Sequence, residues 1–578
     1  MRKLISFFAL LCYCLCMVSA AWSQAGVTND ALKKLLKERE DHFRSNSNDS
    51  LNPLGDFSEA KFKADHDFAV QYLSKLKTLG ADSLNFDDQV TLELLKFTTD
   101  NDVYTYEYKS YLNPILVDDG FQIELPRFIP KSFRNAHEVD NYLKILNDIP
   151  RFCNEHFELM RRGLKAGISQ PPVVVQSFAA SYNDQIVANA TESIFYAPFK
   201  TKPAAIDSAS WKAYAAKGLQ AVKEKILPQY KAIKKFYEEE YIPQTKKSLG
   251  VIDYPNGSAF YQQKVNYYTT TEVSYNEVYE LGLREVARIE KEMLEVMKET
   301  GFKGNLSSFI QMLRTNPKFY AKTPDELLKE ASFIAKRIDG KLPQFFGKLP
   351  RLPYTVAPVP ADLAPNYTAG RYSPGRGTRA GEYWVNTYNL PARSLYNLEA
   401  LSLHEAVPGH HLQIALSLEL ENVPAFRRNL YVNAFGEGWA LYCEWLGTEM
   451  GFYKDPYSRF GKLTYEMWRA CRLVLDVAIH TKGWSRQQAV DYLASHTALS
   501  MHEVGTEIDR YISWPGQALS YKFGELKIRE LRAKAEKELG TAFDIRAFHD
   551  MLLSKGTVTL SVMEKMADRF IAEKKSTK

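Results

Sequence analysis

Apolar residues recur every three or four positions along most of this chain, with charged residues between them. This spacing places the apolar side chains on one face of an α-helix. In the first half of the chain it predicts helices over four segments, Asp30–Arg44, Asp88–Thr99, Val139–Gly163 and Ser208–Glu240. The pattern therefore favours a mainly α protein.

The helical pattern continues in the second half. Ser274-Tyr-Asn-Glu277 has the sequence of a capping box, and an amphipathic pattern follows it to about Thr300. Helical spacing returns over Leu306–Thr315 and Pro324–Leu342. We expect three successive helices in this region.

The pattern breaks between Gly347 and Gly381, where six prolines and several glycines predict a long irregular loop. Such a loop within a globular protein is usually either functional or disordered. The aromatic and β-branched segment Glu382–Tyr388 follows it and predicts a short strand. Because the next helix begins at Ser394–Leu403, we expect a small β edge beside that helix.

The chain has 578 residues, which is long for a single hydrophobic core and predicts two lobes. We expect a signal peptide over residues 1–25, an N-terminal helical lobe over 26–250, and a C-terminal helical lobe over 251–578 that holds the functional site. Two positive residues, an apolar run from Leu4 to Val18 and small residues after it are typical of an export signal. Cleavage is expected after Ala20 or Ala25, and an uncleaved membrane anchor is the alternative.

Charge and cysteine content argue against a nucleic-acid-binding protein and against a protein built on a disulfide framework. The net charge of +5 is not concentrated in one run, so we expect no nucleic-acid partner. No later segment is apolar enough to span a bilayer, so we expect a periplasmic or secreted protein without stable membrane association after cleavage. Outside the signal only Cys153, Cys443 and Cys471 remain. They allow one disulfide, Cys443–Cys471, although a buried free thiol fits the apolar surroundings of Cys443 better.

The main chemical motif is Ser402-Leu-His-Glu-Ala-Val-Pro-Gly-His-His-Leu-Gln413, which holds three of the 11 histidines. A His-Glu pair followed by further histidine is typical of a zinc hydrolase, in which imidazoles hold the metal and the glutamate is the general base. His404 and Glu405 would have these roles. In the usual His-Glu-x-x-His spacing the second histidine is four residues after the first, but here that position is Pro408.

The second ligand must therefore come from His410 or His411. On a regular helix, a residue six positions on is rotated by about 120° and lies about 9 Å along the axis, too far to share a zinc ion with His404. Pro408 and Gly409 predict a kinked or widened turn that brings one late histidine back. We favour His410, because it needs the smaller bulge, and keep His411 as the alternative.

A third ligand is expected in Asn433–Leu446, an apolar and aromatic helical segment that contains Glu437 and Glu444. A buried carboxylate is costly unless it is paired or binds metal. Glu437 is flanked by two glycines that permit close approach of another backbone, so we predict it as the ligand, with Glu444 supporting the site. Alternatively, both acids form salt bridges to Arg469 or Arg472.

Further candidates lie on either side of these motifs. Tyr521 follows a Pro-Gly turn, and its hydroxyl could stabilise an oxyanion, with Arg510 or Tyr511 nearby; core packing of this tyrosine is the alternative. Three strand residues are expected to bind an extended substrate by pairing with its backbone: Tyr383, Val385 and Asn386.

Together the segments His404–Gln413, Gly436–Glu444 and Arg510–Tyr521 resemble the bacterial family called domain of unknown function 885, most densely from about 260 to 560. More distantly the chain is similar to helical zinc peptidases such as carboxypeptidase Taq, thimet oligopeptidase and angiotensin-converting enzyme. That resemblance implies a two-lobed helical zinc-peptidase-like architecture, with His410 at the second-ligand position. The two extra residues between Glu405 and His410 depart from the peptidase pattern.

From these observations we expect an exported zinc-dependent hydrolase, a metallopeptidase whose substrate is a peptide or another small amide. Two alternatives stay open. One is a metal-dependent hydrolase of a non-peptide amide or ester. The other is an exported binding protein without catalytic activity.

Overall fold

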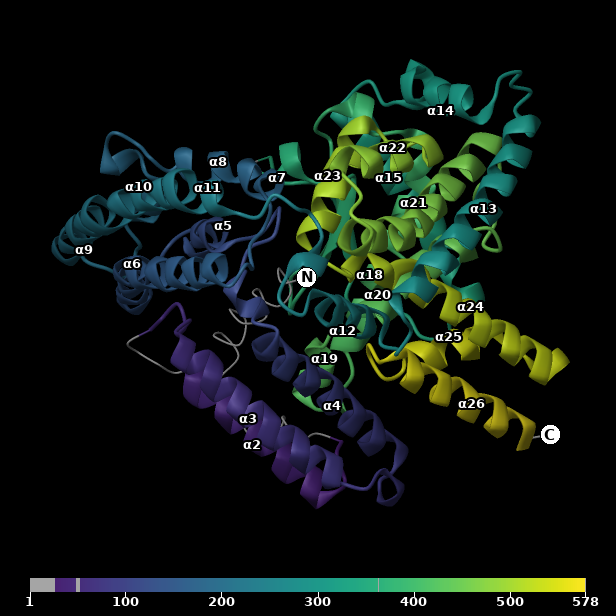
Figure 1. Cartoon of the computed structure of the whole chain (residues 1–578), viewed down its shortest axis with the longest axis horizontal. Coiled ribbons are helices and arrows are strands. Elements are labelled where there is room, and N and C mark those ends of the chain that lie inside the picture. Colours follow the sequence, from purple (N-terminus) through teal and green to yellow (C-terminus); the bar gives the residue numbers. More distant parts are fainter. Residues whose placement is uncertain (1–25, 48–51, 362, 577–578) are drawn as a thin grey trace.

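The computed structural model describes residues 26–47, 52–361 and 363–576, and these form a mainly α protein with one small sheet (Figure 1). The mainly α fold predicted from the sequence is thus confirmed. The expected signal peptide, with its cysteines and cleavage sites, lies outside the described residues.

The first three helices that the structure describes pack around a small core of their own. They are α2 (Asp30–Ser47), α3 (Glu59–Thr78) and α4 (Phe86–Glu107). α3 and α4 begin at Ser58 and Asn85, whose side chains accept hydrogen bonds from backbone N–H groups of the first turn. Buried apolar residues of all three helices pack together.

A second core lies between α6 (Ala136–Lys165), α9 (Ser208–Ala221) and α10 (Leu227–Lys235). The helix predicted over Ser208–Glu240 is present, but it contains two π-helical turns, Val222–Ile226 and Phe236–Tyr241. The short helices of this half are α5 (Phe121–Glu124), α7 (Pro172–Val175), α8 (Ala179–Asn183) and α11 (Ile242–Gln244).

The largest core lies in the second half of the chain. Four of its helices pack in pairs, α13 (Tyr275–Glu299) with α21 (Pro456–Thr481) and α20 (Asn433–Leu446) with α24 (Ser520–Leu539). The other helices there are α12 (Gly257–Thr269), α14 (Leu306–Thr315), α15 (Pro324–Asp339), α16 (Leu342–Phe345), α17 (Leu398–Glu405), α18 (His410–Leu418), α19 (Ala425–Asn429), α22 (Arg486–His496), α23 (Met501–Ser513), α25 (Ile545–Leu553) and α26 (Leu560–Ser576). The predicted capping box before α13 is confirmed, whereas α12 is not among the helices predicted from the sequence.

The predicted irregular loop contains two strands that join the predicted one in a sheet. The strands are β1 (Tyr354–Pro358), β2 (Gly370–Ser373) and β3 (Gly381–Val385), in the order β1-β3-β2. β1 runs parallel to β3 and β2 runs antiparallel to it. β2 packs against α17, so the small β element beside the His-Glu helix is confirmed. The expectation that β3 pairs with a substrate is wrong, because both of its edges are already paired within the sheet.

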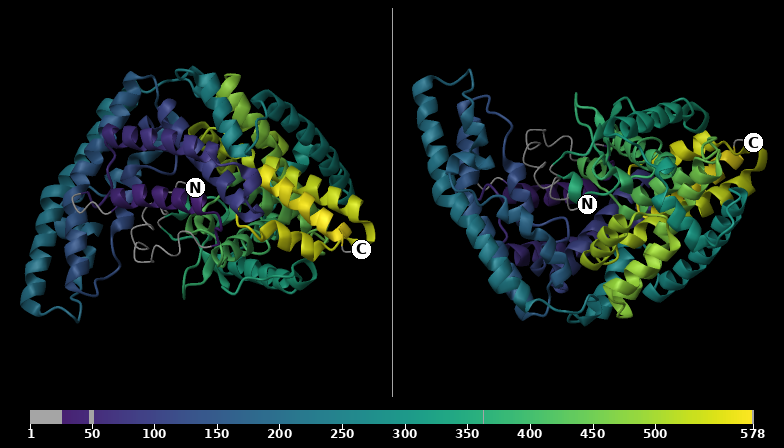
Figure 2. Two further views of the ribbon diagram at one scale, coloured as in Figure 1. Left: turned by 90° about the horizontal axis from the view of Figure 1, so that it is seen from below. Right: turned by 90° about the horizontal axis from the view of Figure 1, so that it is seen from above.

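The views in Figure 2 place the helices of residues 130–245 on one side of the molecule and the second half on the other, with α2–α4 between them. A cleft of about 2190 Å³ is lined by residues of both halves, including Tyr111 and Phe121 from one and Tyr431 and Trp514 from the other. The boundary near residue 250 stays a prediction, since Val174 of the first half belongs to the main core.

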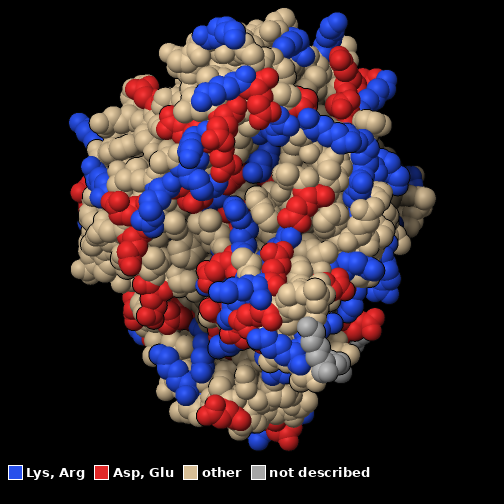
Figure 3. Space-filling model, turned by 90° about the vertical axis from the view of Figure 1, so that its right-hand side faces the viewer, with Lys and Arg blue, Asp and Glu red and all other residues tan. Residues whose placement is uncertain are grey.

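Three observations bear on the expectations about charge, cysteines and membranes. Basic and acidic side chains are interspersed on the face drawn in Figure 3. Cys153, Cys443 and Cys471 are buried free thiols, so the Cys443–Cys471 disulfide is not formed. Within the described ranges, no helix combines the length and apolar character needed to cross a membrane.

Candidate metal centre

The predicted break at Pro408-Gly409 separates two helices. α17 ends at Glu405 and α18 begins at His410, so the helix stops and restarts instead of merely kinking as expected. The chain turns tightly here: a Cβ atom on Gly409 would lie only 1.9 Å from the carbonyl oxygen of His404. The Trp439 indole donates a hydrogen bond to the Pro408 carbonyl at 2.8 Å and ties the turn to α20.

Gly409→Ala should therefore destabilise the fold, because the added methyl group collides with backbone of α17. We expect the free energy of unfolding to fall by about 2 kcal/mol or more, as overpacked sites do. Gly80→Ala is the control, since a Cβ at Gly80 meets nothing within 4 Å. Denaturant unfolding measures both changes, and equal stability of the two variants would contradict this account of the turn.

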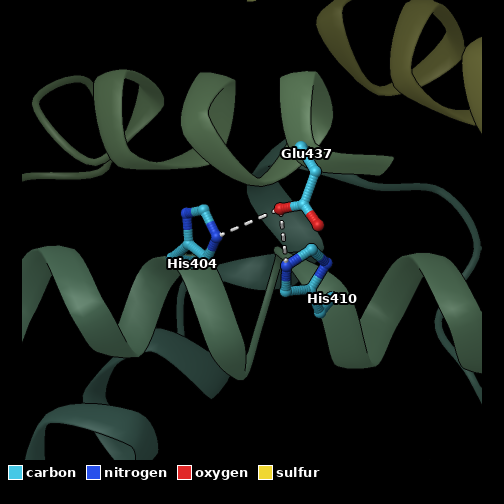
Figure 4. A group of neighbouring side chains, drawn as sticks. All are labelled: His404, His410 and Glu437. Atoms are coloured by element: carbon cyan, nitrogen blue, oxygen red, sulfur yellow. Dashed lines mark ion pairs between the residues drawn. The ribbon is translucent and has the colours of Figure 1, made fainter. Parts of the chain in front are cut away.

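The break brings His404 and His410 to the same point, opposite Glu437 of α20 (Figure 4). Glu437 Oε2 lies 3.8 Å from His404 Nε2 and 3.4 Å from His410 Nε2. Ligand atoms of all three residues lie within 4.8 Å of one another, and all three side chains are buried. His411 is outside this cluster.

The three residues fit one zinc ion. Tetrahedral coordination with bonds of about 2.0–2.1 Å holds ligand atoms about 3.3 Å apart, and the two His–Glu separations of 3.4 and 3.8 Å are close to this value. Two imidazoles and one carboxylate are also a ligand set that catalytic zinc sites use. Small side-chain movements would complete the geometry.

Neighbouring residues orient the cluster. Glu444 Oε1 lies 2.7 Å from His404 Nδ1, and Arg469 lies 3.3 Å from the same oxygen. Glu444 thus combines both roles considered from the sequence, support of the site and a salt bridge. The Tyr431 hydroxyl donates to Glu437 Oε1 at 3.2 Å, which leaves Oε2 facing the histidines.

The charges around the cluster favour a cation. Burial alone would lower the pKa of His404, but the carboxylates of Glu437 and Glu444 raise it to about 9. Burial alone would raise the pKa of Glu437, but His410 and His404 hold it well below its ordinary value. Burying carboxylates is costly without positive charge nearby, so either protonated histidine or a metal ion satisfies this arrangement.

Glu444→Gln should lower zinc affinity by about 10- to 100-fold, because it removes the carboxylate that orients His404. Glu525→Gln is a matched control: Glu525 is equally buried and pairs with Lys522 and Arg529, but not with the cluster. Competition with a chromophoric chelator measures both affinities. The support role of Glu444 is wrong if the two variants bind zinc equally well.

Glu405 lies beside the cluster at the edge of the sheet. The backbone N–H of Tyr372, in β2, donates to Glu405 Oε2 at 2.8 Å. The Tyr372 hydroxyl lies 2.9 Å from His411 Nδ1. Burial lowers the pKa of His411 to about 4, so this imidazole is neutral near pH 7. His411 therefore packs against β2, the strand whose Tyr372 N–H group binds the Glu405 carboxylate.

Tyr521 and Arg510 are adjacent, as the sequence predicts, whereas Tyr511 has a different environment. The Tyr521 ring stacks on His404 with 6.4 Å between ring centroids, and Arg510 donates to the Tyr521 hydroxyl at 3.1 Å. The Tyr511 hydroxyl accepts hydrogen bonds from Trp468 and Arg472 at 2.9 and 3.0 Å. Tyr511 thus positions Arg472. Its own hydroxyl proton is directed at the Glu507 carboxylate, so it is not available to stabilise an oxyanion as expected.

The three strand residues predicted to bind substrate are structural. Tyr383 and Val385 are buried in the core, and the Tyr383 hydroxyl lies 3.3 Å from Ser402 Oγ. The Asn386 amide donates to three carbonyl groups of the preceding loop, those of Ala364, Tyr367 and Thr368. This correction follows from the central position of β3.

Two contacts of the site could not be predicted from the sequence. Tyr372 lies in the proline-rich segment predicted as an irregular loop, and its strand is only four residues long. Tyr431 lies two residues before α20, and nothing in its local pattern distinguishes it from the other 33 tyrosines. Tyr431 also lines the cleft, so it connects the cleft to Glu437.

Comparison with known proteins identifies relatives of unknown function. One is a crystal structure described as "the putative lipoprotein from Colwellia psychrerythraea", with a TM-score of 0.82 and 26% identity over 89% of this chain and 92% of that one. Another is "a putative lipoprotein of unknown function from Shewanella oneidensis", with a TM-score of 0.70 and 17% identity over 93% and 100%. The second likeness shows a shared fold alone. No curated protein matches the chain.

The family comparison confirms the resemblance drawn from the motifs. Residues 45–566 match the family described as "Bacterial protein of unknown function (DUF885)". This match includes all the residues of the candidate centre and most of both lobes. The chain therefore belongs to the bacterial protein family DUF885.

Proposed function

We propose that this protein is a zinc-dependent hydrolase that cleaves amide bonds in peptides. The observation that carries the proposal is the buried cluster in which His404, His410 and Glu437 direct their ligand atoms at one point. Glu405 directly follows the first of these histidines, so a carboxylate that could act as general base lies next to the proposed metal ligands. A protein that only binds metal has no need of this base.

A zinc ion bound there would lower the pKa of a water molecule and polarise the substrate carbonyl. Glu405 would take the proton from the attacking water and later give it to the leaving amine. The hydrogen bond from the Tyr372 N–H to Glu405 Oε2 fixes the direction of this carboxylate. The short strand β2 therefore positions the base.

Tyr521 would stabilise the negative charge that develops on the carbonyl oxygen. Its hydroxyl oxygen accepts the hydrogen bond from Arg510, which leaves the hydroxyl proton free to be donated. The positive charge of Arg510 also makes that proton a stronger hydrogen-bond donor. Donors that are already in place before the reaction are the most effective stabilisers of such charge.

The size of the cleft supports an extended substrate. Pockets for small ligands usually have volumes of about 300–1,000 Å³, and the cleft of about 2190 Å³ exceeds this range. Tyr431 and Trp514 line the cleft, and both contact residues of the candidate centre. The three ligand residues do not line the cleft themselves, so a peptide bound there would have to pass Tyr431, which contacts Glu437, to reach the cluster.

We also propose that the protein is exported to the periplasm or secreted. The sequence of residues 1–25 has the pattern of a signal peptide. The relative from Colwellia is described as a "putative lipoprotein", and lipoproteins are exported proteins. Mass spectrometry of the protein isolated from its host would test this proposal, because cleavage predicts a new N-terminus after Ala20 or Ala25.

The proposed activity can be tested with zinc-loaded protein and two sets of compounds, one of short peptides and one of non-peptide amides and esters. We expect hydrolysis of peptides, and loss of that hydrolysis when the metal is removed by a chelator. Hydrolysis of the second set alone would favour the non-peptide hydrolase. Zinc binding without any hydrolysis would favour the binding protein.

A further inference from the structure

Two arginines contact Tyr521, and a third lies near one of them. The Arg472 guanidinium lies over the tyrosine ring at 4.0 Å from its centroid, and Arg510 donates to its hydroxyl. The third is Arg371, which precedes Tyr372 in β2. Tyr367, Asp118 and Glu405 raise the pKa of Arg371, whereas burial and the charge of Arg510 lower it.

Three carboxylates lie near these three arginines. Glu507 is shared by Arg472 at 2.7 Å and Arg510 at 3.5 Å. Burial would raise the pKa of Glu507, but both arginines lower it to about 2, so it remains a single negative charge. Asp118 supplies the second carboxylate near Arg510. The other nearby acid, Glu405, has the role of base in the proposed mechanism.

Among the three, Arg510 is placed to meet a ligand from the cleft. Its side chain is 17% exposed, whereas that of Arg472 is 2% exposed and held against Glu507 and Tyr511. The Arg510 guanidinium lies 5.9 Å from the ring centroid of Trp514, which lines the cleft. Gln517 accepts a hydrogen bond from Arg510 at 2.7 Å and fixes its orientation. Arg510 therefore lies between the cleft and Tyr521.

We propose that Arg510 binds a carboxylate of the substrate next to the bond that is cleaved. Arg510 Nη2 already donates to Gln517 and to Tyr521, so the carboxylate would be held by the positive charge and by the N–H groups that these two residues do not use. Because Arg510 also contacts the tyrosine that would face the reacting carbonyl, carboxylate and carbonyl must belong to the same or adjacent residues. The substrates are then amides of amino acids with a free α-carboxylate, such as the C-terminal residue of a short peptide. This inference rests on the proposed hydrolase function.

The test measures binding, so that it does not depend on turnover. Zinc-loaded Glu405→Gln protein is titrated in a calorimeter with a set of N-acetyl dipeptides that have free carboxylates. The same dipeptides as C-terminal carboxamides form the second set. Loss of a charged hydrogen-bond pair typically weakens binding by about 10- to 100-fold, so we expect the acids to bind at least about 10-fold more tightly than the amides.

A second substitution assigns this preference to Arg510. Adding Arg510→Gln should abolish the difference between acids and amides, and Arg510→Lys should restore part of it. Arg486→Gln is the matched control, because Arg486 of α22 makes a two-point ion pair with Asp509, the neighbour of Arg510 on α23. Equal binding of acids and amides, or a preference that persists in Arg510→Gln, would overturn the proposal.

A third set identifies the source of the carboxylate. It holds carboxamide dipeptides with Asp or Glu as the second residue. If these bind as the free acids do, Arg510 still binds a carboxylate, but the assignment of the substrates to amides with a free α-carboxylate is overturned. The results separate this inference from the proposed function. If the acids bind more tightly but the native protein hydrolyses nothing, only the catalytic role is refuted. Hydrolysis without the preference refutes only this inference.

Discussion

Replacing Glu405 with glutamine should leave the zinc content of the protein unchanged and lower its hydrolytic rate by about 100-fold or more, as loss of a general base does. Glutamine has nearly the same size and can still accept the hydrogen bond from the Tyr372 N–H through its carbonyl oxygen. It cannot take up a proton from water. Elemental analysis and steady-state kinetics on the same preparation measure both quantities.

Glu399→Gln is the control for this prediction. Glu399 lies on the same helix and contacts Arg337 and the backbone of Tyr453, away from the cluster. We expect this variant to retain its turnover, although it could lose some stability. Full hydrolytic activity in Glu405→Gln would show that another group is the base and that the proposed mechanism is wrong.

The two adjacent histidines should differ strongly in their effect on zinc affinity. His410→Ala removes an imidazole whose Nε2 lies 3.4 Å from Glu437, so we expect zinc affinity to fall by about 100-fold or more. His411→Ala removes an imidazole that contacts Tyr372 in β2. It should chiefly lower turnover, because the strand that positions Glu405 loses its packing partner.

Direct titration of zinc into each metal-free variant separates these outcomes. The two substitutions serve as controls for each other, since each removes one imidazole from the first turn of α18. A larger loss of zinc affinity in His411→Ala than in His410→Ala would transfer the ligand role to His411. The geometry of the helix break would then have to differ from the one described.

Much of the candidate centre could be predicted because its residues lie in informative local patterns. Glu437 lies in an apolar helical segment between two glycines, Gly436 and Gly438, and this pattern predicts it as a ligand. The structure gives the reason for one of these: a Cβ on Gly438 would lie 2.5–2.6 Å from Gly524 of α24. The glycine allows α20 and α24 to pack backbone to backbone, and a close approach of this kind is what the sequence indicates. The capping box at Ser274 was predictable for the same reason, because its signal is local.

The rest depends on contacts between distant segments. β1 and β2 were not predicted because proline and glycine hide the short strand pattern around Gly370–Ser373. The hydrogen bond from Tyr372 to Glu405 and that from Tyr431 to Glu437 arise only after folding. The assignment of Tyr383 to substrate binding failed for a related reason: the strand alone does not reveal that it has neighbours on both sides.

The central claim is that His404, His410 and Glu437 form a zinc site, and elemental analysis of the purified mature protein tests it most directly. After zinc loading and removal of excess metal, the account predicts about one zinc per chain, as a single three-ligand site requires. Parallel samples of His404→Ala and Glu437→Ala, shown by circular dichroism to be folded, should contain far less. No retained zinc in the native protein, or full occupancy in both folded variants, would contradict the account.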